Sequence, residues 1–456
     1  MPLTALPPGP ERPPAWQMLR YQREPIAYVE ACTRRYGPVF TLRLPFVGPM
    51  VAAVAPDDVQ AILARAPDRF PDGPDSSPLA PIMGESAMVF ATGATHRRQR
   101  RLLWPAFHGS LVARMGEQMA TIAQTELARL PVGEPVATLP VARRIAVAVV
   151  CELAFGSIEP LSFARLRDEV GRRDDPRLVL MLLFPTLWRR GGRLNPGRTL
   201  KRRRDTVNRL LREQIALRRA VPPEGQERGD VLSLLVAARD ERGDALTAAE
   251  IRDQLVGLFV VGHETMAAAL AWALERVSRA PAVRERLVDE LAADRTEYLD
   301  AIVNETLRLR PPLLDAARTT SAPLELGGHP IPPGTVVSAM CAVAQRRGDL
   351  WEDPLAFRPE RFLGGRPALG AFAPFGGGPR RCIAAAVSTL LMQTVVRVAL
   401  ERATLTAAPG PEERARLYGL SLLPSRGGRV VLRRPRGAHS TRSSSISGGR
   451  VASQLG

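Results

Sequence analysis

Residues 375–382 read Phe-Gly-Gly-Gly-Pro-Arg-Arg-Cys, and an apolar stretch, Ile383 to Leu400, follows at once. The apolar stretch predicts a helix, so the glycine-rich turn delivers a single cysteine, Cys382, to a helix N-terminus. Gly376 to Gly378 allow the backbone to fold closely under a flat ligand and to aim N–H groups at the sulfur. The positive end of the helix points at that sulfur and favours its thiolate form. This stretch therefore predicts a thiolate held beneath a flat ligand.

A single thiolate in this setting suits the axial ligand of a haem iron, and the neighbouring Arg380 can pair with a haem propionate. An electron-rich thiolate pushes charge onto the iron and favours cleavage of bound dioxygen. Taken separately, a lone cysteine is usually a small core residue and a Gly-Gly-Gly-Pro run is usually a surface turn. Their combination with Phe375, Arg380 and a following helix favours the haem ligand.

The same eight residues resemble the haem-binding loop of the cytochrome P450 family: Phe, two residues, Gly, one residue, Arg, one residue, Cys. Ala384 and Ser388 stand where the family usually has Gly and Ala. Both are small, so we expect helix packing against the haem to survive. The resemblance runs from about Pro7 to Leu432. It implies a mostly α-helical fold with a small β-rich region, in which haem b lies between a long central helix and the helix after the cysteine loop.

The composition limits which classes of protein the chain can belong to. The chain has 456 residues, and a hydrophobic content of 45% is ample for a sizeable core. Its four cysteines are widely spaced, which argues for a reducing compartment and against disulfides or a structural zinc site. The proline-rich N-terminus does not have the apolar core of a secretory signal. We therefore expect a cytoplasmic monomer without a transmembrane anchor.

The charge balance points to a protein partner. The chain carries 63 basic and 46 acidic residues, and Lys201 is its only lysine. Part of this charge is explained by a compositional bias toward arginine. No zinc-finger spacing or aromatic–glycine RNA motif is present, and 5% aromatics leave few rings to stack bases, so we expect no nucleic-acid binding. An acidic protein is the expected target of a basic face.

The chain divides into a proline-rich lead (residues 1–20), a single catalytic domain (21–433) and a basic Ser/Gly/Arg tail (434–456) that we predict to be disordered. Helical periodicity dominates from Thr95 to about Leu400. Strand-like runs are Val39–Leu44, Val51–Ala55, Leu324–Leu326, Val336–Ala339 and Arg429–Leu432.

The longest predicted helix starts at a capping box, Thr247-Ala-Ala-Glu250, and runs to about Arg279. Its centre is apolar enough for a transmembrane helix, but ionisable residues at mid-span argue for a buried helix instead. Gly262 weakens the helix there, and the Thr265 hydroxyl can bond to a carbonyl one turn earlier, which opens a groove.

Glu264 beside Thr265 places an acid next to an alcohol, the pair needed to deliver protons to bound dioxygen. Taken alone, the same residues also fit an ordinary helix that tolerates Gly262 and carries an acid without a catalytic role. Upstream of the cysteine loop they resemble the family's oxygen-activating groove, which implies a catalytic role for both. Val261 stands where the family usually has Ala or Gly, so we expect a narrower distal pocket.

Glu305 and Arg308 lie three residues apart on one predicted helix face, a spacing that alone indicates a surface ion pair. Arg361 follows in a proline-rich segment. Together the three match the family's buried charged triad, which implies that they brace the protein beneath the cysteine loop and have a structural role.

His96 and Arg100 lie one helical turn apart. The resemblance implies that both hold haem propionates, together with Arg318 and Arg380, because two buried carboxylates need cationic partners. The neighbouring Arg97, Arg98 and Arg101 are predicted to face elsewhere, either as a solvated face or as a docking surface for an acidic electron donor.

Two weaker signals concern the substrate. The region 181–204, apolar and then basic, fits a lid over the substrate entrance or a contact with a membrane surface. An apolar substrate cavity is predicted from a set of side chains, each of which alone fits ordinary core packing. The set is Met83, Val89, Phe90, Val260, Val261 and Leu314.

The resemblance implies a monooxygenase of secondary metabolism that hydroxylates or epoxidises a small terpenoid, fatty acyl, steroid or polyketide scaffold. Because nothing in the chain resembles a fused reductase, electrons are expected from a ferredoxin or flavodoxin with its reductase. The alternatives are a peroxide-driven peroxygenase and a non-catalytic haem protein for gas sensing or storage. Glu264 and Thr265 argue against both, since neither needs an acid–alcohol pair.

Overall fold

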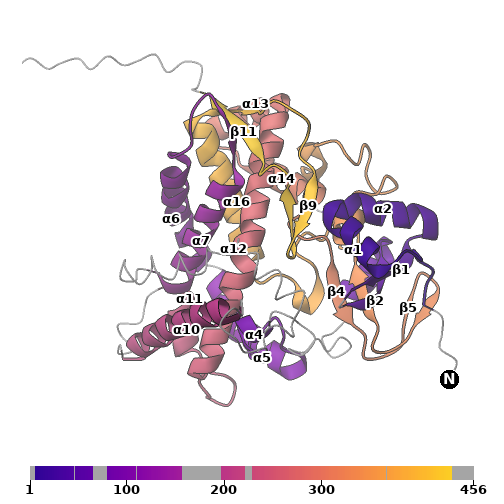
Figure 1. Ribbon diagram of the computed structural model, residues 1–456. Helices are drawn as coiled ribbons and strands as arrows, with labels where there is room; N and C mark the ends of the chain where they lie inside the picture. The colour runs from indigo at the N-terminus through magenta and orange to yellow at the C-terminus, as the bar shows by residue number, and fades with distance from the viewer. Residues whose placement is uncertain are drawn as a thin grey trace, which may run out of the picture.

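Helix α12 (Ala248–Arg279) forms the centre of the computed structural model (Figure 1). It starts at the predicted capping box, where the Glu250 N–H donates to the Thr247 hydroxyl and the Thr247 N–H donates to the Glu250 carboxylate. The helix is long and apolar enough to cross a membrane, yet 67% of its most apolar window is buried within the protein, as expected of a core helix. The structure describes residues 6–45, 47–64, 80–108, 110–156, 197–220, 229–365 and 367–433.

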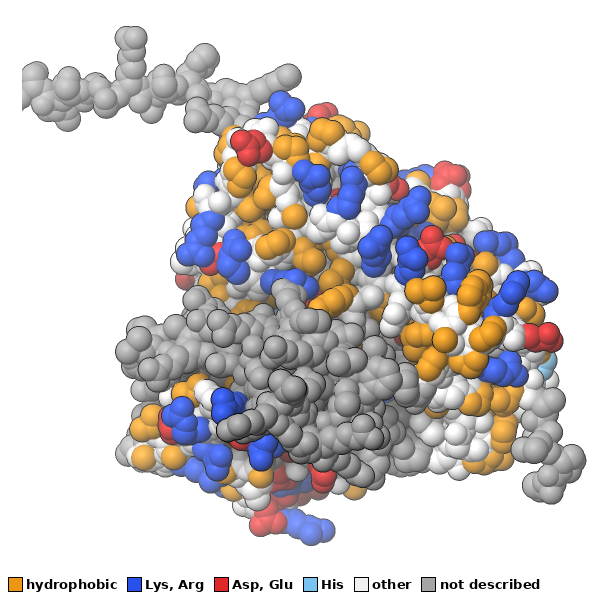
Figure 2. Space-filling view, in the orientation of Figure 1, with side chains coloured by type: hydrophobic (Ala, Val, Ile, Leu, Met, Phe, Trp, Pro, Cys, Tyr) orange, Lys and Arg blue, Asp and Glu red, His pale blue; other side chains and the backbone are white. Residues whose placement is uncertain are grey.

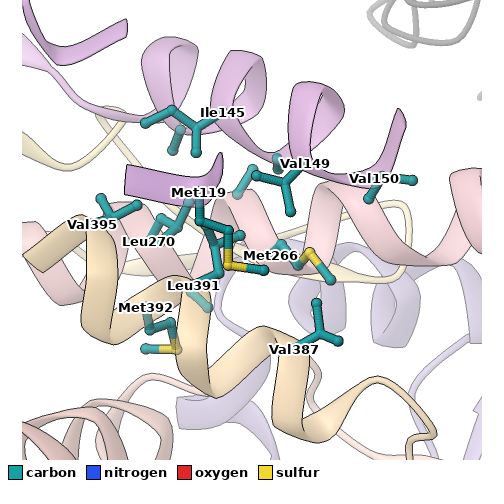
Figure 3. Close-up of a cluster of buried hydrophobic side chains, with 14 of the residues drawn as sticks. Met119, Ile145, Val149, Val150, Met266, Leu270, Val387, Leu391, Met392 and Val395 are labelled. Atoms are coloured by element: carbon teal, nitrogen blue, oxygen red, sulfur yellow. The ribbon is translucent and has the colours of Figure 1, made fainter. Parts of the chain in front are cut away.

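The helical core surrounds α12. Helices α6 (Ser110–Leu127), α7 (Leu139–Phe155) and α16 (Ala385–Arg402) pack against one another and against α12. Figure 3 shows apolar side chains from these four helices meeting in one buried cluster. They include Met119, Ile145, Val149, Met266, Leu270, Val387, Leu391 and Val395.

A smaller β-rich part lies beside the helical body, together with α1 (Pro14–Arg23) and α2 (Pro25–Tyr36) (Figure 1). Its sheet has the strand order β1-β2-β7-β4, in which β2 and β7 are parallel and the outer pairs antiparallel. The strands are β1 (Val39–Leu44), β2 (Gly48–Ala53), β7 (Val336–Ala339) and β4 (Ala316–Thr319). A second hydrophobic core fills this part.

The remaining elements connect these two parts. The helices are α3 (Pro56–Ala64), α4 (Ala80–Met83), α5 (Gly93–Leu103), η3 (Trp104–Phe107), α10 (Gly197–Arg219), α11 (Val231–Ala237), α13 (Pro281–Ala292), α14 (Glu297–Leu309), α15 (Cys341–Ala344), η6 (Pro359–Phe362) and η7 (Gly378–Arg380). The strands are β3 (Pro135–Ala137), β5 (Leu324–Leu326), β6 (His329–Ile331), β8 (Thr404–Ala407), β9 (Ala415–Tyr418), β10 (Ser421–Pro424) and β11 (Arg429–Arg433).

The prediction of a mostly helical protein with a small β-rich region is confirmed. The second predicted strand begins three residues earlier, at Gly48, and ends at Ala53, because its ladder pairs with the whole of β1. The proline-rich lead also differs from the expected separate segment: the Thr41 N–H donates to the Pro8 carbonyl and the Thr41 hydroxyl to the Pro7 carbonyl, so this stretch lies along β1. The predicted tail, 434–456, and residues 181–196 of the predicted lid lie outside the described residues.

The basic side chains on the face seen in Figure 2 are dispersed. Figure 2 shows Lys and Arg side chains scattered among hydrophobic and neutral ones over the visible face, with acidic side chains between them. On this face the charge of +17 does not form one continuous stripe.

Candidate active site

The glycine-rich loop places Cys382 just before helix α16, which begins at Ala385, two residues later than the predicted helix. The Cys382 N–H donates to the Phe375 carbonyl at 2.9 Å and closes the loop. Gly378 is required here for two reasons. Its φ is +60°, and a Cβ would lie 2.4 Å from the Leu63 carbonyl oxygen of α3. The loop is therefore pressed against α3 while it presents the cysteine.

Cys382 is accessible to solvent, although elements packed around it surround its thiol. Burial raises the pKa of the Cys382 thiol above its ordinary value, while a hydrogen bond from the Ala384 backbone and the charges of Arg381 and Arg100 act in the opposite direction. A thiolate at this place consequently needs a further cation to stabilise it, and a metal ion supplies one.

Arginines from three elements lie near His96 of α5: Arg100 from α5, Arg318 from β4 and Arg380 from η7, and Arg100 also lies near Cys382. His96 is buried, and its Nδ1 atom has no hydrogen-bond partner. Burial lowers the pKa of His96 to about 4, and the charges that lower it further are all arginines, first Arg380, then Arg100 and Arg318. Half-buried arginines around a buried, unsatisfied imidazole fit a ligand that carries carboxylates.

These residues fit haem. Cys382 would supply a sulfur ligand for the iron, and the arginines around His96 would supply partners for two propionates. Arg380 also donates to the Ala91 carbonyl at 2.9 Å and the Val89 carbonyl at 3.4 Å, which ties the cysteine loop to the segment between α4 and α5.

The predicted bond within α12 is present. The Thr265 hydroxyl donates to the Val261 carbonyl at 3.0 Å and the Gly262 carbonyl at 3.1 Å. The helix remains continuous through these residues, so this side-chain bond occurs without a break in the helix.

Glu264 faces α7, where Arg143 binds it through two hydrogen bonds. Arg143 Nη2 donates to Glu264 Oε1 at 2.7 Å, and Arg143 Nε donates to Oε2 at 3.2 Å. The carboxylate side chain is only 10% exposed, so the bidentate pair holds it firmly. Sequence reasoning missed Arg143. An arginine inside the apolar stretch Leu139–Phe155 is the signal that could have found it, since such a residue needs an acid partner.

The structure brings together Glu305, Arg308 and Arg361. Arg308 Nε and Nη2 donate to the two Glu305 oxygens at 2.6 and 2.8 Å, and Arg361 Nε donates to Oε1 at 3.3 Å. The side chains of Glu305 and Arg308 are fully buried. Arg308 Nη1 also donates to the carbonyls of Gln345 and Pro354, so the pair fastens α14 to the segment that leads toward the cysteine loop.

The predicted substrate-lining residues divide into two groups. Met83 and Phe90 are buried and pack with Val260 in a small apolar cluster. Val89 and Val261 are exposed, which is unusual for such side chains and fits the wall of an open cavity. Leu314 is 1% exposed and packs in the core of the β-rich part, whereas its neighbour Leu313 is 39% exposed. Leu314, predicted to line the substrate cavity, is therefore a core residue, and Leu313 is the exposed one of the two.

Two of the arginines considered for a docking surface are bound within the chain. Arg98 pairs with Asp240 at 2.7 Å and with Glu250 at 3.1 Å, and Arg101 pairs with Glu241. These ion pairs join α5 to the segment before α12 and to the first turn of α12. Arg98 and Arg101 thus connect two elements of the fold, which sequence spacing did not indicate.

Comparisons with known proteins agree with this site. A family model described as Cytochrome P450 matches residues 7–430. The chain is 34% identical to a putative cytochrome P450 135B1 of Mycobacterium tuberculosis, over 97% of this chain and 94% of that protein. It is 36% identical to a putative cytochrome P450 137 of the same species, over 88% and 84%. A solved structure, retinoic acid bound cyanobacterial CYP120A1, is similar with a TM-score of 0.80 and 25% identity, over 95% of this chain and 100% of that one.

Proposed function

Because the chain belongs to the cytochrome P450 family, and is thus a haem-thiolate monooxygenase, we propose that it hydroxylates or epoxidises a small hydrophobic molecule. The expected scaffolds are terpenoid, fatty acyl, steroid or polyketide, as in secondary metabolism. The retinoic acid bound to the similar cyanobacterial protein is itself a small and largely apolar molecule, which supports this range. We propose a separate ferredoxin or flavodoxin, with its reductase, as the electron donor.

In this proposal Cys382 is the axial ligand, and His96, Arg100, Arg318 and Arg380 hold the propionates of haem b. When bound, the haem supplies the iron at which dioxygen is activated, with electron density contributed by the thiolate. The observation that carries the assignment is the group of half-buried arginines around the buried His96, one of which, Arg100, also lies near Cys382.

Thr265 and Glu264 are proposed to handle protons. The Thr265 hydroxyl is held by the carbonyls of its own helix, so its oxygen has a defined position from which a proton can pass. Arg143 fixes the orientation of the Glu264 carboxylate through its bidentate pair.

The proposed substrate contacts are apolar. Val89, Val261 and Leu313 are each about two-fifths exposed, and the cluster of Met83, Phe90 and Val260 lies close to them in sequence. Such a surface binds a hydrophobic molecule by removing apolar area from water.

We propose a cytoplasmic location and a monomeric state for the protein. All four cysteines are free, which suits a reducing compartment. Size-exclusion chromatography with light scattering tests the monomeric state, and a dimer would contradict it.

The first experiment is the absorption spectrum of the dithionite-reduced protein under carbon monoxide, beside a Cys382→Ala variant. We expect a strongly red-shifted Soret band that the variant loses. A Soret band at the histidine-ligated position would refute thiolate ligation. Hydrophobic libraries can then be titrated for substrate-induced spin shifts, and turnover measured with a ferredoxin system. Product formed with peroxide alone would favour a peroxygenase, and a spin shift without any turnover would favour a non-catalytic haem protein.

A further inference from the structure

Four side chains at four-residue spacing form a stripe that runs from α5 into η3 and just beyond it: His96, Arg100, Trp104 and His108. Residues four apart lie on one helix face. The Arg100 guanidinium carbon lies 5.4 Å from the centroid of the Trp104 ring. The rings of Trp104 and His108 are stacked, with centroids 3.5 Å apart and planes 13° apart. The last three side chains therefore form one continuous stack.

The stripe runs from a buried end to an exposed one. His96 is 3% exposed, whereas Trp104 is 42% exposed. Arg100 lies between them, and its charge interacts with that of Cys382. An indole that contacts a guanidinium and stacks on a second ring is held in a defined orientation.

Arg100 is in an unfavourable setting before any anion is bound. Burial lowers the pKa of its guanidinium, and the charge of Arg381 lowers it further. Within the described residues, Arg100 makes no hydrogen bond or ion pair with the protein, in contrast to Arg98 and Arg101 on the same helix. The Trp104 ring is the contact that the structure gives its guanidinium.

We propose that Trp104 is a positioning residue, which holds the Arg100 guanidinium toward the haem propionate through a cation–π contact while His108 supports the ring by stacking on it. This inference rests on the proposed function, in which Arg100 binds a propionate. A guanidinium over an indole face is attracted by the negative π surface, and the attraction restricts an otherwise mobile side chain. Trp104 thus determines how closely the Arg100 guanidinium approaches the haem propionate.

Two properties of the purified haem-loaded protein test this role. The first is the rate of haem transfer to an excess of apomyoglobin. We expect Trp104→Ala to accelerate it about two- to fivefold, equivalent to ~0.5–1 kcal/mol, and Trp104→Phe to accelerate it less because Phe is the weaker cation–π partner. The second is the haem reduction potential. A positive charge near the haem disfavours ferric iron, so Trp104→Ala is expected to lower the potential, in the same direction as Arg100→Ala.

The matched control is Trp16→Ala. Trp16 is also 42% exposed and is flanked by two arginines, Arg12 and Arg20, each with its guanidinium carbon 5.8 Å from the ring centroid. It lies on α1, in the β-rich part of the molecule. Trp16→Ala is expected to leave both haem properties unchanged, which separates positioning of Arg100 from the general loss of a surface tryptophan.

A double-mutant cycle decides whether Trp104 acts through Arg100. If it does, adding Trp104→Ala to the Arg100→Ala protein changes the haem-transfer rate and the reduction potential little further. His108→Phe, which keeps a ring stacked on Trp104, is expected to behave like the wild type, whereas His108→Ala is not. Fully additive effects of the two alanines would overturn the proposal, and so would wild-type haem properties in Trp104→Ala alongside altered ones in Arg100→Ala. If Arg100→Ala itself changes neither property, the propionate assignment fails together with this inference.

Discussion

Replacing Glu305 by glutamine tests the structural role of the buried charged triad. The Glu305 carboxylate accepts hydrogen bonds from Arg308 at 2.6 and 2.8 Å, from the Arg358 backbone N–H at 2.9 Å and from Arg361 at 3.3 Å. Glutamine has the same shape, but it removes the negative charge and turns an NH2 group toward a guanidinium. The fully buried Arg308 then has no counter-charge from this position.

The expected loss of stability is large. Removing one partner of a buried ion pair costs about 3–5 kcal/mol, because the remaining charge stays in the protein without compensation. This is a substantial fraction of the free energy of unfolding, which is ~5–15 kcal/mol for folded proteins. With a denaturant slope of about 3 kcal/mol/M in urea, the unfolding midpoint falls by roughly 1 M or more.

The assay is urea unfolding of the haem-loaded protein, followed by far-ultraviolet circular dichroism and by the Soret band. Glu213→Gln is the control. Glu213 pairs with Arg209 at 3.3 Å on α10, where both side chains are more than half exposed, so its loss is expected to cost less than about 1 kcal/mol. Equal midpoints for Glu305→Gln and Glu213→Gln would refute the reasoning from buried charge.

Three further predictions follow from the site. Thr265→Ala removes the hydroxyl proposed to pass a proton, so product formed per electron pair consumed should fall while haem content stays normal; unchanged coupling would contradict that role. Arg143→Ala leaves the Glu264 carboxylate without its bidentate partner and should lower stability by about 1–3 kcal/mol. Arg144→Ala, on the same helix, removes a half-exposed side chain whose partner Glu126 keeps Arg129 at 2.7 Å, and it should cost less than about 1 kcal/mol; equal losses in urea unfolding would count against the pair. The pKa of His96, lowered to about 4, means that the haem-free fold disfavours its protonation. The unfolded state therefore binds more protons between pH 6.5 and 4, and the free energy of unfolding of the haem-free protein should decrease as the pH falls through that window. His96→Gln should weaken this pH dependence. Identical plots of unfolding free energy against pH for the two proteins would show that His96 does not cause it.

Features that depend on neighbouring residues could be predicted from the sequence. The capping box, the helix that follows it and the bond from Thr265 to its own helix each involve residues within one turn. The spacing of Glu305 and Arg308 placed them on one helix face. Their burial, which is complete in the structure, was predicted only from the resemblance to a family. In these cases the helical repeat alone determines which side chains meet.

Features that depend on partners far along the chain could not be predicted. Arg143 and Glu264 are 121 residues apart, and Arg98 and Asp240 are 142 residues apart. Leu313 and Leu314 are equally apolar neighbours, and only the packing of the β-rich part decides which of them is buried. A local pattern indicates which side of an element is apolar, but not which other element packs against it.

The sequence by itself determined the family and the long central helix and predicted the cysteine ligand, because each is encoded in a short run of residues with its own geometry. The contact of Trp104 with Arg100, four residues earlier, is likewise local. The tertiary structure alone decided how Glu264 is held and where Arg98 and Arg101 are bound. Those contacts arise when the folded chain buries charged side chains, since a charge that leaves water must find a partner from whichever element lies opposite.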